Sequence, residues 1–212
     1  QEKTEEPTLV DQHTTDDDQL QEQRALQLEI DALPELELDV FDTIQLAQIS
    51  HGLKHGDYAR YRAYTTRRLR RLRRLLKFTH GRGRYARRPL EPVATRDARH
   101  LMLPLFCAER AWSHAMQIKL ENTAMEPRPR IHLLGRLRKA ASWAAKLASL
   151  TAVRADQRTQ LEARAYSAFM LGNVGLEREQ WHSALAAFKT CHTLCTELAR
   201  VSLAEHAHLY RK

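Results

Sequence analysis

The chain has 212 residues, 43% of them hydrophobic, which is enough to bury the core of one large domain. Seven glycines and seven prolines among many Ala, Leu, Arg and Glu residues favour helix, and no apolar run approaches the roughly 18 residues of a membrane-spanning helix. The net charge is +8, and three cysteines are too few for a disulfide framework, which favours a reducing compartment and buried thiols.

Charge is distributed unevenly along the chain. Residues 1–50 hold 14 acidic and 2 basic residues, whereas residues 51–100 hold 16 basic and 3 acidic residues. Such a concentrated basic block is typical of an electrostatic binding surface. Residues 1–34 lack a sustained apolar period and predict a mostly disordered acidic tail, and residues 35–212 predict one all-α domain. The chain begins at Gln1, and we expect a fragment of a longer protein.

After the tail, apolar residues recur at helical spacing, which predicts a stack of antiparallel helices. Asp57 is expected to cap the second helix, and Pro104 to kink the third or to mark its start. The expected inward-facing residues of the fourth helix are Leu134, Leu137, Ala141, Ala144 and Leu147. The expected helices cover residues of about 36–50, 58–78, 97–120, 131–150, 156–176 and 179–200, with a last one starting near Ser202.

The second expected helix, from Tyr58 to about Phe78, has two chemically distinct faces. At 100° per residue, one face gathers Tyr58, Tyr61, Thr65, Leu69, Leu72 and Leu76. The opposite face gathers Arg60, Arg67, Arg70, Arg71 and Arg74, with Arg68 and Arg73 on its flanks. Each pair of like charges four residues apart costs a few tenths of a kcal/mol, so we expect a polyanion to neutralise this face.

Structured RNA is the expected polyanion. Guanidinium groups bind phosphate in a bidentate manner and stack on bases, and only Lys54 and Lys77 among the basic residues of 51–100 are not arginines. The chain has no helix-turn-helix signature for reading B-DNA, and an arginine-rich helix fits an A-form major groove only where a bulge or junction opens it. An anionic membrane surface, an acidic protein and a merely solvated face stay open as alternatives.

The expected RNA contacts extend beyond this helix into a basic loop, "THGRGRYARRPLEP", and a later "GRLRK" segment. His51 and His55 bracket the turn before the helix, and turn-stabilising hydrogen bonds explain them as well as phosphate contact does. The predicted RNA-binding residues are Lys54, His55, Arg60, Arg67, Arg68, Arg70, Arg71, Arg73, Arg74, Lys77, Arg82, Arg84, Tyr85, Arg87, Arg88, Arg136, Arg138 and Lys139.

Neither catalysis nor a cofactor is expected. The sequence lacks a glycine-rich phosphate loop, a His-Glu-x-x-His motif and a nucleophile elbow. Cys191 and Cys195 share a helix face, but His192 points about 100° away, and no second pair of metal ligands is near. Core packing is therefore the expected role of the two cysteines.

One pair of helices matches the spacing of a tetratricopeptide repeat. Gly172, Trp181, Ala184 and Phe188 place a small residue in the first helix and aromatics in the second, so that the helices pack closely and the rings fill the groove. The fold class expected is thus a tetratricopeptide-like stack. The spacing also leaves open a peptide-binding module that takes an acidic protein partner in the groove near Trp181.

Four segments carry a family resemblance. "HGLKHGDYARYRAYTTRRLRRLRRLLKF", "AERAWSHAMQIK", "PRIHLLGRLRKAA" and "LEARAYSAF" closely resemble, in order and spacing, the RNA-binding domain of the 68-kilodalton protein of the eukaryotic signal recognition particle. The match runs from about Leu36 to Leu209 and does not cover the acidic tail.

The resemblance implies a non-catalytic domain that docks on the S domain of the particle RNA at its three-way junction and helps to bend the RNA. Arg67, Arg70, Arg71 and Arg74 would face an RNA groove, and Arg68 and Arg73 would grip the flanking phosphates. The implied partners are the 72-kilodalton subunit, through a region outside this chain, and indirectly the ribosome, without membrane insertion. The implied process is cotranslational targeting to the endoplasmic reticulum, by a cytoplasmic particle that assembles in the nucleolus and associates transiently with the endoplasmic reticulum.

Overall fold

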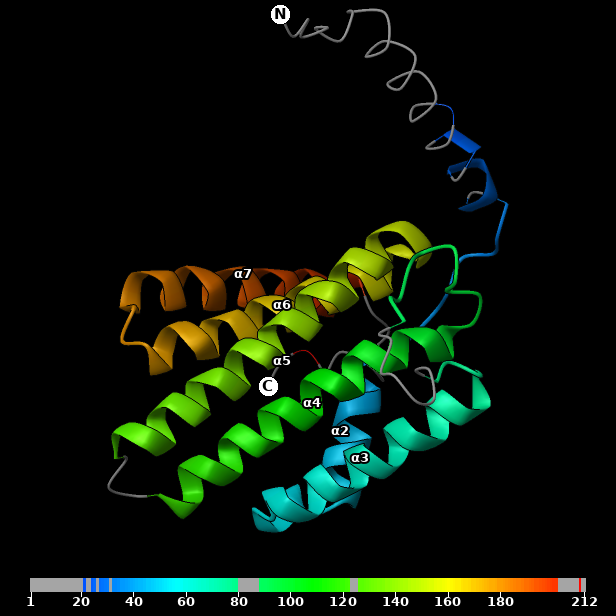
Figure 1. Ribbon diagram of the computed structural model, residues 1–212. Helices are drawn as coiled ribbons and strands as arrows, with labels where there is room; N and C mark the ends of the chain where they lie inside the picture. Colours follow the sequence, from blue (N-terminus) through cyan, green and yellow to red (C-terminus); the bar gives the residue numbers. More distant parts are fainter. Residues whose placement is uncertain are drawn as a thin grey trace, which may run out of the picture.

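The structure is a computed structural model that describes residues 21, 24–25, 27–30, 32–79, 88–122, 126–201 and 210. Its elements are α2 (Val40–Ser50), the 3-10 turn η1 (Leu53–His55), α3 (Tyr58–Leu75), α4 (Ala98–Glu121), α5 (Pro127–Arg154), α6 (Gln157–Glu177) and α7 (Trp181–Val201). In Figure 1, α7, α6, α5, α4 and α3 follow one another from top to bottom, each packed against the next in an antiparallel stack. The expected all-α antiparallel fold is confirmed.

Two expectations fall on parts of the chain that are not described. Residues 1–20 of the acidic tail lie outside the described residues, so the disorder of the tail and the boundary at residue 34 stay predictions. Residues 202–209, where the last helix was expected to start, also lie outside them. Among the described helices, none is both long and apolar enough to cross a membrane.

Aspartate side chains cap the starts of α3, α4 and, through Asp156, α6. The backbone N–H of Arg60 donates to Oδ1 of Asp57 (2.8 Å), which confirms the cap expected before α3. Asp97 accepts in the same way from the N–H of Arg99 (2.8 Å) at the start of α4. Each carboxylate satisfies one of the N–H groups that a helix start leaves without an intrahelical partner, and a negative charge there suits the helix dipole.

The first expected helix begins four residues later than its apolar spacing predicted. Leu36 is instead extended and forms a parallel bridge with Ala155. Its N–H donates to the carbonyl of Arg154 (2.9 Å), and its own carbonyl accepts from the N–H of Asp156 (3.1 Å). Leu36 and Leu38 are both buried, a spacing of two that is typical of extended chain. The prediction of helix from residue 36 is therefore wrong in its first turn.

Three other expectations about helix ends and faces differ from the structure. Helix α5 starts at Pro127, earlier than expected, because proline is well suited to the first helical turn. Leu133 and Ala140 are buried on α5, whereas Leu134 and Ala141 lie only half-buried at the edge of its inner face. Pro104 is buried inside α4 and does not mark its start, which is Ala98.

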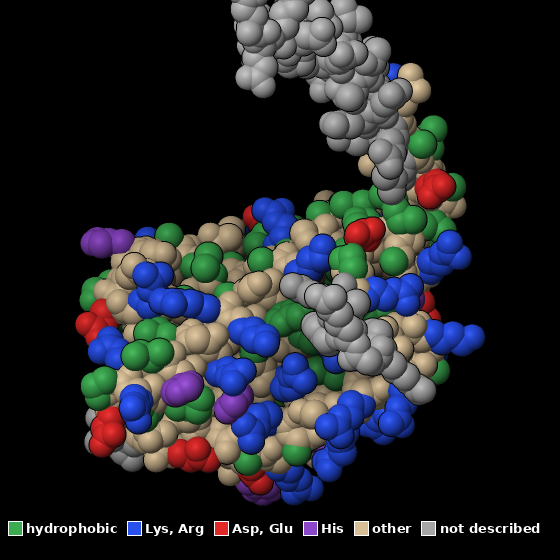
Figure 2. All heavy atoms as spheres, in the orientation of Figure 1, with side chains coloured by type: hydrophobic (Ala, Val, Ile, Leu, Met, Phe, Trp, Pro, Cys, Tyr) green, Lys and Arg blue, Asp and Glu red, His purple; other side chains and the backbone are tan. Residues whose placement is uncertain are grey.

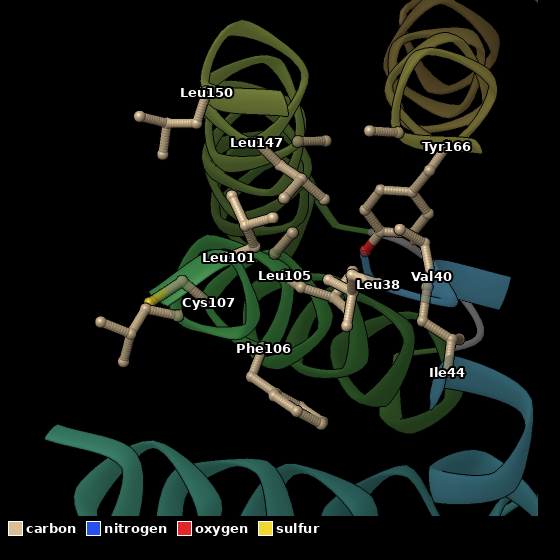
Figure 3. Close-up of a cluster of buried hydrophobic side chains, with 14 of the residues drawn as sticks. Leu38, Val40, Ile44, Leu101, Leu105, Phe106, Cys107, Leu147, Leu150 and Tyr166 are labelled. Carbon is tan, nitrogen blue, oxygen red and sulfur yellow. The ribbon is translucent and has the colours of Figure 1, made fainter. Parts of the chain in front are cut away.

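The main core lies among α2 to α6. Figure 3 shows Leu105 and Phe106 of α4 in this cluster, with Leu147 of α5 and Val40 of α2 nearby. Helix α3 contributes Tyr61, Leu69 and Leu72, all buried. Since its inner face is fixed in the core, the opposite face of α3 must point outward.

Candidate nucleic-acid interface

The two faces of α3 are separated as expected. Tyr61, Thr65, Leu69 and Leu72 are its buried residues. The exposed arginines are Arg60, Arg67, Arg70, Arg71 and Arg74, and the half-buried ones on the flanks are Arg68 and Arg73. Figure 2 shows Lys and Arg side chains gathered on the lower right of the molecule, where Figure 1 places α3. The predicted arginine face therefore exists, while its contact with RNA stays a prediction.

Within the described part of the chain, the positive charge of α3 is not neutralised by a neighbouring carboxylate. Among the described residues, no carboxylate lies within 4.0 Å of an α3 guanidinium. The Arg68 guanidinium lies over the ring of Phe106, 5.9 Å from its centroid, and its Nε is buried without a hydrogen-bond partner. Arg73 donates to Sγ of Cys107 at 4.0 Å, a weak contact. The arginine array is therefore held in place by packing and left free to bind an anion.

The turn before α3 positions the first arginine. Gly52 has φ of 117°, a conformation that favours glycine, and a Cβ there would lie 2.9 Å from the carbonyl oxygen of Asp57. Its own carbonyl accepts from the N–H groups of His55 and Asp57, both at 3.0 Å. The tight turn thus brings the capping residue to the start of α3. Lys54 and His55, both predicted contacts, are exposed on this turn.

His51 is explained by ring stacking. Its ring lies 3.5 Å from that of Tyr64, centroid to centroid, with 19° between the planes. Burial, followed by the nearby Arg60, Arg67 and Arg71, lowers the pKa of His51 below its usual value. His51 therefore packs on Tyr64 beside the arginines, and its contact with phosphate stays a prediction.

A second basic feature lies between α3, α4 and α5, and we call it the α3–α4–α5 groove. Its volume is about 590 Å³. Cys107 and Ala111 of α4 are small residues in its lining, and none of the described residues in that lining is acidic. The charged or titratable lining residues are Arg62, Arg67, Arg70, Arg110, His114, Arg136 and Lys139, besides the Cys107 thiol. Arg67 and Arg70 from α3 thus meet Arg136 and Lys139 from α5, four residues that were predicted separately.

Sequence reasoning missed three members of this groove: Arg62, Arg110 and His114. Arg110 and His114 are one turn apart on α4 and share a face, which was the available signal. Burial, then Arg62 and Arg136, lower the pKa of His114, although Glu121 opposes them. We therefore expect a neutral imidazole beside a cluster of permanent cations in the free protein.

The other predicted contacts lie in different places. Arg138 is exposed on α5 but is not part of the groove lining. Lys77 is exposed just beyond α3, and its carbonyl accepts from Nη1 of Arg88 (3.3 Å). The Arg88 guanidinium also lies 4.9 Å from the ring centroid of Phe78. Arg82, Arg84, Tyr85 and Arg87 lie outside the described residues.

The α6–α7 pair confirms one part of the repeat-like spacing and corrects another. A Cβ on Gly172 would lie 2.6 Å from the Phe188 ring, so the absent side chain permits the close packing that was expected. Trp181, the first residue of α7, is 61% exposed. The prediction that Trp181 fills the groove is wrong.

Cys191 and Cys195 are also placed differently from the prediction of core packing. Both are half-buried and line a cavity of about 1140 Å³ between α2, α6 and α7, which we call the apolar cavity. The helical turn of α7 that contains both cysteines lines this cavity, so the two side chains are not enclosed in the core. Within the described part of the chain, no three His, Cys, Asp or Glu residues come together as a metal site.

Comparisons with known proteins agree with this architecture. A family model described as "RNA-binding signal recognition particle 68" matches residues 53–212. The chain is 37% identical over 180 residues to signal recognition particle subunit SRP68 of Drosophila melanogaster, covering 82% of this chain and 30% of that protein. It is 31% identical over 183 residues to the subunit of the same name from Caenorhabditis elegans, covering 78% and 29%.

A solved structure is similar as well. The SRP68-RBD from Chaetomium thermophilum shares 30% identity with a TM-score of 0.69, over 76% of this chain and 78% of that one. The chain spans about 30% of the length of the curated relatives named above. The resemblance found in the sequence is confirmed. The chain therefore belongs to the signal recognition particle 68 family and represents its RNA-binding domain.

Proposed function

We propose that the domain binds the S domain of signal recognition particle RNA near its three-way junction, through the exposed face of α3, and helps to bend it. The observation that carries this proposal is the arginine array of α3, which is fixed by a buried inner face and has no carboxylate within 4.0 Å among the described residues. Phosphates would supply the missing counter-charge through bidentate hydrogen bonds.

The geometry of α3 supports a junction over a plain duplex. An α-helix with its side chains is about 10–12 Å wide, and the A-form major groove is too narrow and deep to take it. Because Tyr61, Leu69 and Leu72 hold α3 against the core, the helix cannot adapt its position to the RNA. The RNA groove must then widen or the RNA must bend. The free energy of this deformation is lowest where a junction already interrupts the stacking of base pairs.

The family suggests a larger setting for this activity. The domain would act as an assembly and remodelling element of the particle, while a region outside this chain binds the 72-kilodalton subunit. The bent RNA would be presented toward the ribosome during cotranslational targeting to the endoplasmic reticulum. The corresponding locations are the cytoplasm, the nucleolus during assembly and, transiently, the endoplasmic reticulum.

A module for acidic proteins receives less support. Trp181, near which the groove for such a partner was expected, is exposed and does not line the apolar cavity. Within the described residues, that cavity holds Arg200 as its single arginine, and Glu109 is also part of its lining. An acidic peptide would find little counter-charge there.

The test compares a three-way-junction RNA with a plain duplex of equal length. If six or more phosphates are engaged, affinity should fall about thousandfold or more between about 50 and about 200 mM salt, and the preference for the junction should persist. Replacing Arg67, Arg71 and Arg74 by Gln should abolish junction binding.

The matched control removes the same charge elsewhere, by replacing exposed Arg164, Arg178 and Lys189 of α6 and α7 by Gln. It should leave the preference intact. Equal affinity for both RNAs, or an equal loss in the two triple variants, would contradict the proposal and reduce α3 to a general polycation.

A further inference from the structure

We propose that the α3–α4–α5 groove is a phosphate-binding site of its own, which holds the backbone of an unpaired RNA strand leaving the junction beside α3. This inference rests on the proposed function, since it adds a second contact on the same RNA. The residues that define the site come from three helices and converge only in the folded chain.

The charge of the groove matches this ligand. Among the described residues, six arginines and lysines line it without any acidic residue, and a concave surface of one sign concentrates its potential. Apart from His114, the remaining lining residues, Ala63, Thr66, Cys107 and Ala111, are small. A sugar–phosphate backbone can therefore approach the wall between the long cationic side chains, where guanidinium groups bind phosphate in pairs of hydrogen bonds.

The size and composition of the groove favour a single strand. A volume of about 590 Å³ is in the range of pockets that take up small molecules, so it suits one nucleotide unit but not a duplex. Apart from the imidazole of His114, the lining has no aromatic ring on which a base would stack. The groove would therefore bind phosphate with little preference for base.

The site is separable from the outer face of α3. Arg110 and Arg136 belong to α4 and α5, and Arg62 lies on the side of α3 that turns toward them. Arg60, Arg71 and Arg74 lie on the exposed face and are not part of the groove lining. Two sets of three arginines can thus be neutralised without overlap.

His114 gives the site a signature that the outer face lacks. The charged and titratable groups around it are Arg62 from α3, Arg110 and Glu121 from α4, and Arg128, His132, Arg136 and Lys139 from α5. A bound phosphate would offset these cations and favour the imidazolium. Binding of an unpaired strand should then take up a proton, and affinity for that strand should rise as the pH falls through the range in which histidine titrates.

The experiment uses a three-way-junction RNA with an unpaired strand and the same RNA after that strand is paired with a complementary oligonucleotide. The groove variant replaces Arg62, Arg110 and Arg136 by Gln, and the outer-face variant replaces Arg60, Arg71 and Arg74. The control again replaces Arg164, Arg178 and Lys189, and thermal melting checks that each variant is folded. If the groove variant with three substitutions has a clearly lowered melting temperature, the single variant Arg136→Gln is used in its place.

The groove variant should lose about tenfold or more in affinity for the unpaired-strand RNA and bind the paired RNA like the control. Its salt slope should fall by about 0.7 for each phosphate lost. The outer-face variant should lose affinity for both RNAs while preferring the unpaired strand, and His114→Gln should remove the pH dependence of that preference. Equal behaviour of the groove variant and the control would overturn the inference and leave the proposed function standing. Loss in the groove variant alone would instead overturn the role of α3.

Discussion

The molecule has two halves that differ in how their charges are compensated. One is the arginine half around α3, and the other is the half around α2 and α6 in which Glu162 is buried. Around α3, arginines lie side by side without a carboxylate in reach among the described residues. On the α2–α6 side, Glu162 is 1% exposed and fully engaged: it accepts from the N–H of Val40 (2.6 Å), from Nε of Arg158 (3.2 Å) and from the hydroxyl of Tyr210 (2.5 Å). Charge that is satisfied internally supports the fold, whereas charge left unsatisfied is available to a ligand.

Glu109 connects the two halves. Its carboxylate accepts hydrogen bonds from the hydroxyls of Tyr61 on α3 and Tyr166 on α6, both at 2.7 Å, and from Nε2 of Gln48 on α2 (3.0 Å). Burial raises the pKa of this carboxyl, although the three hydrogen bonds oppose the rise. One buried side chain on α4 therefore ties the arginine helix to the rest of the stack.

The largest effect is expected from Glu109→Ala. The change leaves two buried hydroxyls and an amide without their acceptor and opens a cavity, so it should lower the free energy of unfolding by about 3–5 kcal/mol. Urea denaturation measures the loss. Glu109→Gln is the matched control, because it keeps one acceptor oxygen and most of the volume, and it should cost clearly less. A loss below about 1 kcal/mol for Glu109→Ala would show that the cluster does not hold the halves together.

A smaller loss of stability is expected at the close contact between α6 and α7, which lies outside the arginine half and depends on packing and not on charge. Gly172→Ala puts a methyl group 2.6 Å from the Phe188 ring and should destabilise the chain by about 1–3 kcal/mol, because α6 and α7 must separate. Gly135→Ala on α5 is the control: nothing lies within 4 Å of its added Cβ, and the helix should gain about 0.5–1 kcal/mol. Thermal melting of both variants should give shifts of opposite sign.

The same contrast explains what could be predicted from the sequence. The arginine face was predictable because Arg60, Arg67 and Arg74 are close in the chain, so one helical period decides where they point. The groove was not, because Arg62 and Arg110 each resemble an ordinary solvated charge on its own helix, and Arg136 was predicted as an RNA contact from its own segment alone. Only the packing of three helices brings them together.

Local periodicity also misled where tertiary contacts decided the outcome. Leu36 fits a helical spacing with the residues of α2, yet its backbone pairs with Arg154 and Asp156, which holds it extended. Trp181 fits a repeat spacing, yet it opens α7 and stays exposed. Glu109 gave no signal at all, since its partners Tyr61 and Tyr166 are 48 and 57 residues away.

A still smaller effect, of opposite sign in the two halves, is expected from removing single arginines. Arg71→Gln relieves repulsion with Arg67 four residues earlier and should stabilise the RNA-free chain by a few tenths of a kcal/mol at low salt. Arg158→Gln removes the partner of Glu162 and Asp39 and should destabilise it. Urea denaturation at low and high salt measures both, and the gain from Arg71→Gln should shrink as salt screens the repulsion. Shifts of the same sign would contradict the division into uncompensated and compensated halves.

The smallest effect is a pH dependence that belongs to the arginine half. Burial and the neighbouring arginines lower the pKa of His51, so the folded state binds fewer protons there than the unfolded state, whose histidine titrates near its ordinary pKa of 6.5. Stability from this group is therefore present above about pH 6.5 and is lost as the pH falls toward the lowered pKa. The measurement is the difference in unfolding free energy between wild type and His51→Gln from about pH 7.5 to about pH 5.5. Taking the difference removes the opposite contribution of Glu109, whose raised pKa makes stability fall as the pH rises.

His55→Gln, in the same turn but exposed, is the control for this measurement. Arg71→Gln should reduce the slope of stability against pH, because it removes one of the charges that lower the pKa of His51. If His51→Gln leaves the pH dependence of the unfolding free energy unchanged, the arginines do not lower the pKa of this ring. Their charge would then be screened by solvent in the RNA-free protein.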